Sequence, residues 1–220
     1  MIKGRIVDLS HDLHPGKEEY HLRLKTNNTA DLYPQYKVDE GVWYILQDIE
    51  MSSHCGTHIE FPYHHSRDGM DAAKFPLDRL IGECALLDFR HKKPGETVTL
   101  DELKEHGGAI KEGDMIMFNF GCAKYYRTDK SHERPVVAHD AIQWLVGKKI
   151  NIIGSDASGI ELKGAPNQPN HQLLMDNGIP IIEFAANLDK LTKQRFVLFV
   201  LAIAAHGLDS CPVRLIAIED

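Results

Sequence analysis

The most informative stretch of the chain lies between residues 53 and 65, and it reads Ser53-His54-Cys55-Gly56-Thr57-His58-Ile59-Glu60-Phe61-Pro62-Tyr63-His64-His65. Four of its side chains can bind a metal or carry a proton, namely His54, His58, Glu60 and His64. Imidazole and carboxylate are the ligands that suit zinc, manganese and similar divalent ions. The stretch therefore predicts a metal site.

The spacing of these side chains supports the metal site. A β-strand sends alternate residues to one face, so an extended run places His58 and Glu60 together, with His54 in phase. A helix would also bring the two histidines to one face, but Gly56 and Pro62 disfavour a helix here. The alternative is that a chain with thirteen histidines merely clusters some of them on its surface.

Composition narrows the classes of function. A chain of 220 residues is long enough for one domain with a full core, so we predict a single domain over residues 1–220. The net charge of -7 argues against a nucleic-acid partner. No apolar run approaches the roughly 20 residues that span a bilayer, so no membrane segment is expected. The longest such run, residues 196–205, is predicted to be a buried strand.

The N-terminus and the cysteines indicate a cytoplasmic protein. The first five residues lead directly into a strand-like stretch without the apolar core of a signal peptide. The cysteines, Cys55, Cys84, Cys122 and Cys211, are scattered and form no CxxC pair. This pattern predicts reduced thiols, not a disulfide framework. Cys55 is expected to point away from the histidines and to serve as a packing residue.

Strands outnumber helices in the predicted order of elements. Strands are expected at residues 6–9, 20–24, 42–51, 83–89, 114–118, 150–154, 179–183, 196–205 and 212–218. Helices are expected at residues 100–105, 140–146 and 171–177. The first helix has Thr99 as its cap, Glu102 at the capping-box position, and Gly107-Gly108 at its end. Because strands and helices alternate mainly in the middle of the chain, we predict an α/β fold with a mixed or barrel-like sheet.

Two polar stretches interrupt this order. Residues 26–41 are broken by two asparagines and a proline, so we interpret them as a loop of the kind that can move over a site. Residues 124–135 are charged and polar and are predicted to form a second loop.

A second set of candidate residues lies far downstream. His171 begins the last predicted helix, and Glu183 ends the apolar strand that follows. A carboxylate that closes an apolar strand is costly to bury unless it is paired or binds a metal. The alternative is that Glu183 emerges into solvent at the strand end, and the residues alone leave both possibilities open.

The role of His64 differs from that of the other three side chains. A catalytic metal site usually takes three or more protein ligands and leaves a position for water. The first three side chains of the stretch supply that number. His64 lies beyond Pro62, and its imidazole can move protons near neutral pH as a general acid and base.

The run His54-x-Gly56-Thr57-His58-x-Glu60-x-Pro62-x-His64 resembles the HxGTHxDxPxH signature of the cyclase family of metal-dependent hydrolases, which includes bacterial kynurenine formamidase and isatin hydrolase. Similar correspondences follow in the same order along nearly the whole chain, at residues 7–11, 75–82, 113–114, 154–156, 171–183 and 209–214. Such collinear matches make a chance similarity implausible.

The resemblance implies a swivelling β/β/α fold, a homo-oligomer (dimer or tetramer), and one or two ions of zinc or, alternatively, manganese. Family roles pass to matching positions, which makes His54, His58 and Glu60 ligands from the first segment. His171 and Glu183 match ligands of a second metal, and both carboxylates match positions that can bridge two ions. His64 matches the general acid and base.

Two departures from the family pattern bear on these roles. Glu60 stands where the family usually has Asp, and its extra methylene moves the carboxylate by roughly 1.5 Å, which leaves the number of metals open. Formamidases of the family carry a Trp-Pro-Gly-Asp stretch near the N-terminus, whereas residues 14–17 here read His-Pro-Gly-Lys. Kynurenine formamide itself is therefore not implied as the substrate.

These observations together predict a metal-dependent hydrolase that opens an amide, lactam or related carbonyl of a small molecule. In this hypothesis a metal-activated water attacks the carbonyl carbon and His64 returns a proton to the leaving group. One alternative is a relative that acts on lactones or in cyclisation. Another is a metal-binding protein without turnover, but such a protein would not need the proton carrier His64.

Overall fold

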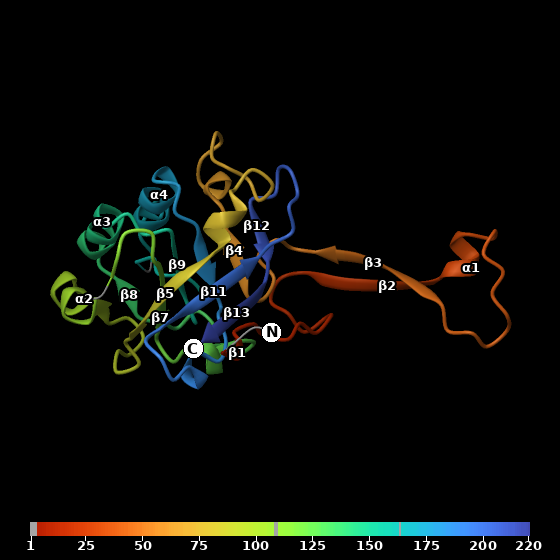
Figure 1. Cartoon of the computed structure of the whole chain (residues 1–220), viewed down its shortest axis with the longest axis horizontal. Coiled ribbons are helices and arrows are strands. Elements are labelled where there is room, and N and C mark those ends of the chain that lie inside the picture. The colour runs from red at the N-terminus through yellow and green to blue at the C-terminus, as the bar shows by residue number, and fades with distance from the viewer. Residues whose placement is uncertain (1–3, 108–109, 163) are drawn as a thin grey trace.

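The computed structural model describes residues 4–107, 110–162 and 164–220, and it confirms the predicted α/β fold with a mixed sheet (Figure 1). Nine strands form the main sheet. Their spatial order is β1 (Arg5–Asp8), β13 (Arg214–Glu219), β11 (Arg195–Leu201), β5 (Ile81–Asp88), β7 (Met115–Asn119), β9 (Ile152–Ser155), β10 (Ile181–Glu183), β4 (His58–Glu60) and β12 (Ser210–Pro212).

The middle of this sheet is parallel and its two sides are antiparallel. Strands β5, β7, β9 and β10 run in one direction, and the remaining neighbours pair antiparallel. Parallel neighbours need crossovers, which here include α2 (Leu100–His106), α3 (His139–Gly147) and α4 (Pro169–Asp176). These helices lie together beside the parallel strands (Figure 1). A short parallel pair, β6 (Thr97–Val98) and β8 (Val136–Val137), accompanies them.

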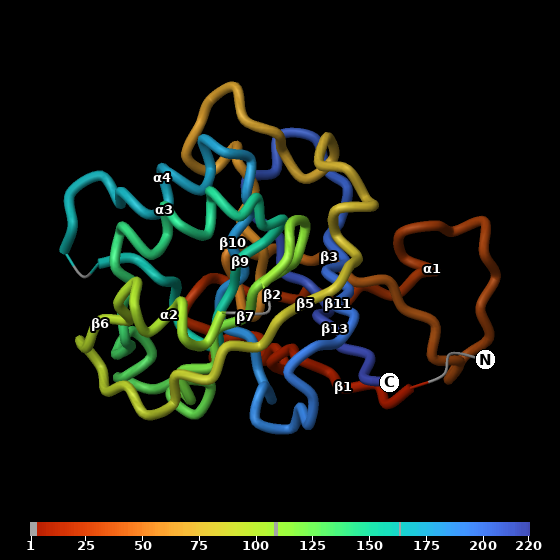
Figure 2. Tube along the Cα trace, turned by 60° about the vertical axis from the view of Figure 1, so that its left-hand side comes forward, coloured from red at the N-terminus to blue at the C-terminus, as the bar shows by residue number. Residues whose placement is uncertain are grey.

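Two hydrophobic cores lie on opposite faces of the sheet. Ile116 and Phe118 of β7 belong to the core that contains helix residues such as Leu145, whereas Met115 and Met117 belong to the other core. Strands distant in the sheet order contribute to this second core, which contains Leu215 of β13 as well as Ile59 of β4. The sheet must therefore curl around it, as the barrel-like prediction requires. The first and last strands lie side by side at one edge (Figure 2).

A long ribbon projects from this body (Figure 1). It consists of β2 (Leu22–Asn28) and β3 (Ile45–Met51), which pair antiparallel, and of α1 (Thr29–Leu32) near its tip. We call residues 22–51 the arm. The prediction of a loop over residues 26–41 is wrong for residues 26–32, which continue a strand and form a helical turn. The segment also lies at the far end of the arm, away from the body that holds the predicted site.

Other expectations hold with shifted boundaries. The capping box of Thr99 and Glu102 is confirmed and Gly107 ends that helix, while Gly108 lies outside the described residues. The strand predicted over residues 196–205 ends at Leu201, because Leu201 already pairs with Arg214, the first residue of β13. All four cysteines are buried and free, as predicted. Within the described ranges, no helix is long and apolar enough to cross a membrane.

Candidate metal centre

The predicted extended run is strand β4, which lies between β10 and β12. His58 and Glu60 face the site, and Ile59 between them points into the second core. The register with β10 places His58 opposite Glu183. Strand pairing therefore brings the downstream carboxylate to the first segment, and its side chain, only 12% exposed, does not emerge into solvent.

His54 reaches the site by a route that the sequence did not indicate. It lies in a turn before β4, where Gly56 adopts a left-handed φ of +70° and where a Cβ atom would collide with Leu13. Thr57 secures this turn because its Oγ1 donates to the main-chain oxygen of Phe184 at 2.6 Å. The turn leaves His54 Nδ1 3.3 Å from His58 Nε2. The two histidines thus meet as predicted, although His54 is not part of the strand.

His64 follows Pro62 on a single 3-10 turn, Pro62–His64, and it faces the same space. Its Nε2 atom lies 3.7 Å from Glu60 Oε1. His171 comes from the first turn of α4, and its Nε2 atom lies 3.7 Å from Glu60 Oε2 and 3.7 Å from Glu183 Oε1. All six predicted site residues are therefore brought together, from five separate elements or turns.

Each of the four imidazoles uses one nitrogen outside the cluster and turns the other inward. Metal-binding histidines typically show this arrangement, because an outer oxygen fixes the ring and its tautomer. The outer contacts are His54 Nε2 to Asp209 Oδ2 at 3.1 Å, His58 Nδ1 to Gly56 O at 2.8 Å, His64 Nδ1 to Asp209 Oδ2 at 3.0 Å, and His171 Nδ1 to Glu161 Oε2 at 3.1 Å.

The inner nitrogens surround two carboxylates. Glu60 Oε1 lies 3.1 Å from His54 Nδ1 and 3.8 Å from His58 Nε2. Glu183 contacts His58 through Oε2, at 3.7 Å, and His171 through Oε1. The two carboxylates therefore connect the histidines of the first segment with His171.

The residues present fit a divalent cation. Glu60 is 4% exposed, and within the described part of the chain its Oε2 atom is buried and has no hydrogen-bond partner. Buried polar atoms normally have a partner, so a vacant carboxylate oxygen facing a histidine is a position for an ion. Two sets of side chains hold ligand atoms close enough to share one ion: His54, Glu60 and His64, and His58, Glu60 and Glu183.

The charges of the site shift three pKa values. Burial alone would lower the pKa of His54, but Glu60 and Asp209 outweigh it and raise that pKa to about 9. The pKa of His171 is likewise lowered by burial, yet Glu161 and Glu183 raise it to about 10. Burial would raise the pKa of Glu60, but hydrogen bonds to the histidines hold it well below its usual value. Opposite charges thus outweigh desolvation at these three side chains.

The cluster opens into a cavity of about 370 Å³, which suits a small-molecule ligand. Gly159 lies against Glu183 with a left-handed φ of +88°, and a Cβ atom there would collide with Glu183 Oε1. The other lining residues outside the cluster are Tyr20, His132, Arg134, Ser158, Glu161, Gln168 and Phe184.

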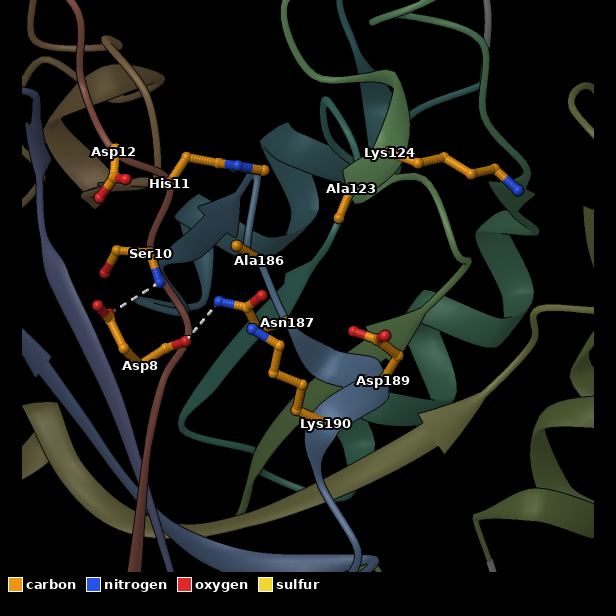
Figure 3. A pocket seen from close by; sticks show the side chains of 10 residues that line it. All are labelled: Asp8, Ser10, His11, Asp12, Ala123, Lys124, Ala186, Asn187, Asp189 and Lys190. Atoms are coloured by element: carbon orange, nitrogen blue, oxygen red, sulfur yellow. Dashed lines mark hydrogen bonds between the residues drawn. The ribbon is translucent and has the colours of Figure 1, made fainter.

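A larger cavity, of about 640 Å³, lies elsewhere, between residues 8–12, 123–124 and 186–190 (Figure 3). Asp8 in it accepts a hydrogen bond from the main-chain N–H of Ser10 at 3.1 Å and pairs with Arg214. The Asn187 side chain donates to the main-chain oxygen of Asp8 at 2.9 Å. None of the candidate metal residues lines this cavity, so its size does not make it the site.

Sequence reasoning missed Asp209 and Glu161. Asp209 holds two histidines and Glu161 holds a third, and Glu161 also accepts from the main-chain N–H groups of Asn170 and His171. A weak signal existed for Glu161, which is a carboxylate between Ile160 and Leu162. No local pattern separates Asp209 from the other aspartates.

Comparison with known proteins also places this chain among cyclase-family proteins. The family described as putative cyclase matches residues 7–162. A kynurenine formamidase from Erythrobacter litoralis is 28% identical over 200 residues, covering 90% of this chain and 87% of that protein. A kynurenine formamidase from Salinibacter ruber is 26% identical and covers 77% of each chain.

Solved structures show the same fold. A potential metal-dependent hydrolase with cyclase activity superposes with a TM-score of 0.78 at 25% identity, covering 98% of both chains. An isatin hydrolase bound to the product analogue thioisatinate gives a TM-score of 0.81 at 20% identity, covering 98% of this chain and 92% of the other. With a family match over most of its length and this shared fold, the chain belongs to the putative cyclase family, as the motif predicted.

Proposed function

We propose that this chain, a metal-dependent hydrolase of the cyclase family, opens the carbon–nitrogen bond of a small aryl amide or lactam, and that residues 1–220 form one domain. The observation that carries the proposal is the arrangement of four imidazoles, each with one nitrogen on an outer oxygen and the other facing a pair of buried carboxylates. A protein that only binds metal also needs metal-binding side chains. The cavity beside them gives a substrate room to bind, and this supports turnover.

We assign the ligand roles to His54, His58 and Glu60 from the first segment and to His171 and Glu183 from the second. The vacant oxygen of Glu60 and the two-sided contacts of Glu183 support bridging between two positions. Imidazole and carboxylate favour zinc, with manganese as the alternative. When bound, such an ion lowers the pKa of a water and polarises a carbonyl oxygen.

His64 is the general acid and base in this proposal. Its Nδ1 atom is held by Asp209, which leaves Nε2 facing the reacting space. Asp209 orients the ring and fixes which nitrogen carries the proton. His64 can then take a proton from the attacking water and return it to the leaving nitrogen.

The test replaces His64 with alanine and measures turnover together with bound metal. We expect a loss of about 10²–10⁴ in kcat, with metal content unchanged. His206→Ala, which removes an exposed histidine outside the site, is the matched control. Full activity of His64→Ala with metal bound would show that the assignment is wrong.

Two further measurements define the reaction. Elemental analysis of the purified protein counts ions per chain and separates zinc from manganese. Turnover of N-formyl aromatic amines, isatin and lactones ranks the substrate classes. The sequence similarity to kynurenine formamidases supports the formamide class, and preferential lactone turnover would contradict the proposed bond type.

We further propose that the protein is cytoplasmic and forms a homodimer through the arm. Free, buried cysteines support the location. One face of the arm carries the apolar cross-strand pairs Leu22–Met51 and Leu24–Ile49, while the other carries charged pairs such as Arg23–Glu50. Isolated two-stranded ribbons are marginal in water, so this apolar face needs a partner.

The extent of the arm matches a dimer interface. Leu46 on the charged face apart, eight of the sixteen exposed large hydrophobic side chains of the described residues lie between Leu24 and Ile49, including Trp43 at 81% exposure. At on the order of 100 Å² each, they present roughly 800 Å², close to one partner's share of a standard interface. The apolar face carries no charge that would repel its own copy across a two-fold axis.

A further inference from the structure

Arg134 is fixed in the wall of the site cavity by main-chain oxygens. Its Nε donates to Ser158 O at 2.8 Å, and its Nη1 donates to Glu161 O at 2.7 Å and to Pro135 O at 3.4 Å. These contacts hold the plane of the guanidinium group. A charged group that is already oriented loses little freedom when it binds a ligand.

The second terminal nitrogen of Arg134 is available. Among the described residues, Nη2 has no hydrogen-bond partner, and it is not fully buried. Arg134 lines the cavity together with Glu60 and His171. The nitrogen therefore offers two N–H donors beside the candidate metal centre.

Among the described residues no carboxylate contacts the Arg134 guanidinium directly, although the charges of Glu183 and Glu161 act on it. Within the described ranges it forms no ion pair, whereas Arg127 and Arg195 each pair with a carboxylate. Burial lowers the pKa of Arg134, but an arginine side chain stays protonated in proteins. A partly buried cation without a paired carboxylate favours an anionic ligand.

Ser158 supplies a second, independent donor. Its Oγ atom is buried and, in the described part of the chain, has no hydrogen-bond partner. Ser158 lines the same cavity, and its main-chain oxygen is the one that Arg134 Nε contacts. Buried hydroxyl groups normally find a partner, so a ligand atom at this position would complete the site.

We propose that Arg134 and Ser158 bind a carboxylate of the substrate, so that the hydrolase selects aryl amides or lactams that carry an acidic group. A monoanion fits better than a phosphate, because Glu60, Glu161 and Glu183 nearby would repel a dianion more strongly. The hydrolysis of such a substrate rests on the proposed function, but the binding of its carboxylate does not. Arg134 and Ser158 act in specificity, not in the bond-breaking step.

The test compares two formamides that differ in one carboxylate, N-formylanthranilate and N-formylaniline. In Arg134→Gln we expect kcat/KM for the acidic substrate to fall about 10–100-fold, mainly through KM, since hydrogen bonds to charged groups are among the stronger ones. The neutral substrate should change less than about twofold. The proposal would be overturned if kcat/KM fell equally for both substrates, or if it fell for neither.

Matched variants separate binding from structure. Arg79→Gln removes another half-buried arginine that contacts main-chain oxygens, outside this cavity, and it should leave the preference unchanged. Ser158→Ala keeps the main-chain oxygen that Arg134 contacts, and it should lower the preference for the acidic substrate several-fold. Arg134→Lys should keep part of the preference for the acidic substrate that Arg134→Gln loses. A purely structural role for Arg134 would not predict this difference.

Binding distinguishes a failure of this inference from a failure of the proposed function. If neither formamide is turned over, calorimetry with benzoate and the metal-loaded protein becomes the readout. Binding that is weakened at least tenfold in Arg134→Gln would support the carboxylate site while contradicting formamide hydrolysis. An absence of benzoate binding to the wild-type protein would overturn the site.

Discussion

The candidate metal centre and the arm are neighbours in the sequence and opposites in their physical character. Strand β3 of the arm ends at Met51, and His54 follows three residues later. In the centre, polar side chains are buried and each imidazole has a defined outer partner. In the arm, apolar side chains are exposed on a thin ribbon. The buried polar groups support the proposed ion site, whereas the exposed apolar groups support the proposed contact between two copies of the chain.

We therefore expect substitutions in the two regions to have independent effects. Changes in the centre should remove metal or turnover and leave assembly intact. Changes on the apolar face of the arm should alter assembly and leave each site intact. Such independence is expected for sites that share no contacts.

The largest effect is expected from the ligand carboxylates. Glu183→Gln should lower turnover on the order of 10³-fold or more, because the ion contributes several kcal/mol to the reaction. Elemental analysis should show fewer ions per chain in the same preparation. Glu112→Gln, on an exposed glutamate paired with Lys149, is the control. If Glu183→Gln kept both its metal and its activity, Glu183 would not be a metal ligand.

A smaller effect is expected at Asp209, which contacts the histidines but not the inner space. Asp209→Asn should cost about 10–100-fold in activity or metal affinity, as is usual for outer partners of metal ligands. It acts through both His54 and His64, so metal affinity and turnover should both change. Asp189→Asn, on an exposed aspartate of the larger cavity, should have no effect. Wild-type kinetics in Asp209→Asn would mean that the ring contacts are incidental.

The apparent affinity for metal should depend on pH, because two of the proposed ligands carry raised pKa values. In the metal-free protein, His54 and His171, with pKa values raised to about 9 and 10, are protonated at pH 7. Ligands must be neutral, so binding releases protons, and apparent affinity should rise about tenfold per pH unit for each proton released. The rise should level off as pH passes these pKa values.

Chelator competition between about pH 6.5 and pH 10.5 measures this slope and the pH at which it levels off. Asp209→Asn removes one of the carboxylates that raise the pKa of His54, so its curve should level off at a lower pH. An affinity that does not change with pH would contradict the charge state inferred for these histidines.

The smallest effect on catalysis is expected from the arm. Ile49→Lys places a charge on the apolar face and should convert a dimer to a monomer in light scattering. The substitution is at an exposed position, so it should change the free energy of unfolding of the monomer by no more than about 0.5 kcal/mol. Leu46→Lys lies on the opposite, charged face and should leave the mass unchanged. A monomeric wild-type protein would contradict the proposed role of the arm.

Local features of the chain are enough to predict the chemistry proposed for the site. Ligand type is a property of each side chain, and the spacing of His58, Glu60 and His64 is local, so a strand and a turn suffice to gather them. The capping box at Thr99 and the alternation of strands and helices are equally local, and both were predicted correctly. The family motif extended this local information to His171 and Glu183 by resemblance alone.

Which distant groups complete the site depends on how the strands pair in three dimensions. Glu183 and Asp209 reach the histidines because β4 pairs with two strands. Glu183 lies on β10, and Asp209 directly precedes β12. Such pairing depends on contacts across the whole chain. Residues 26–32 of the arm were wrongly predicted to be part of a loop for the same reason, because these polar residues lack the alternation that a packed strand shows. Local patterns report what a side chain can do, whereas long-range strand pairing decides which side chains it meets.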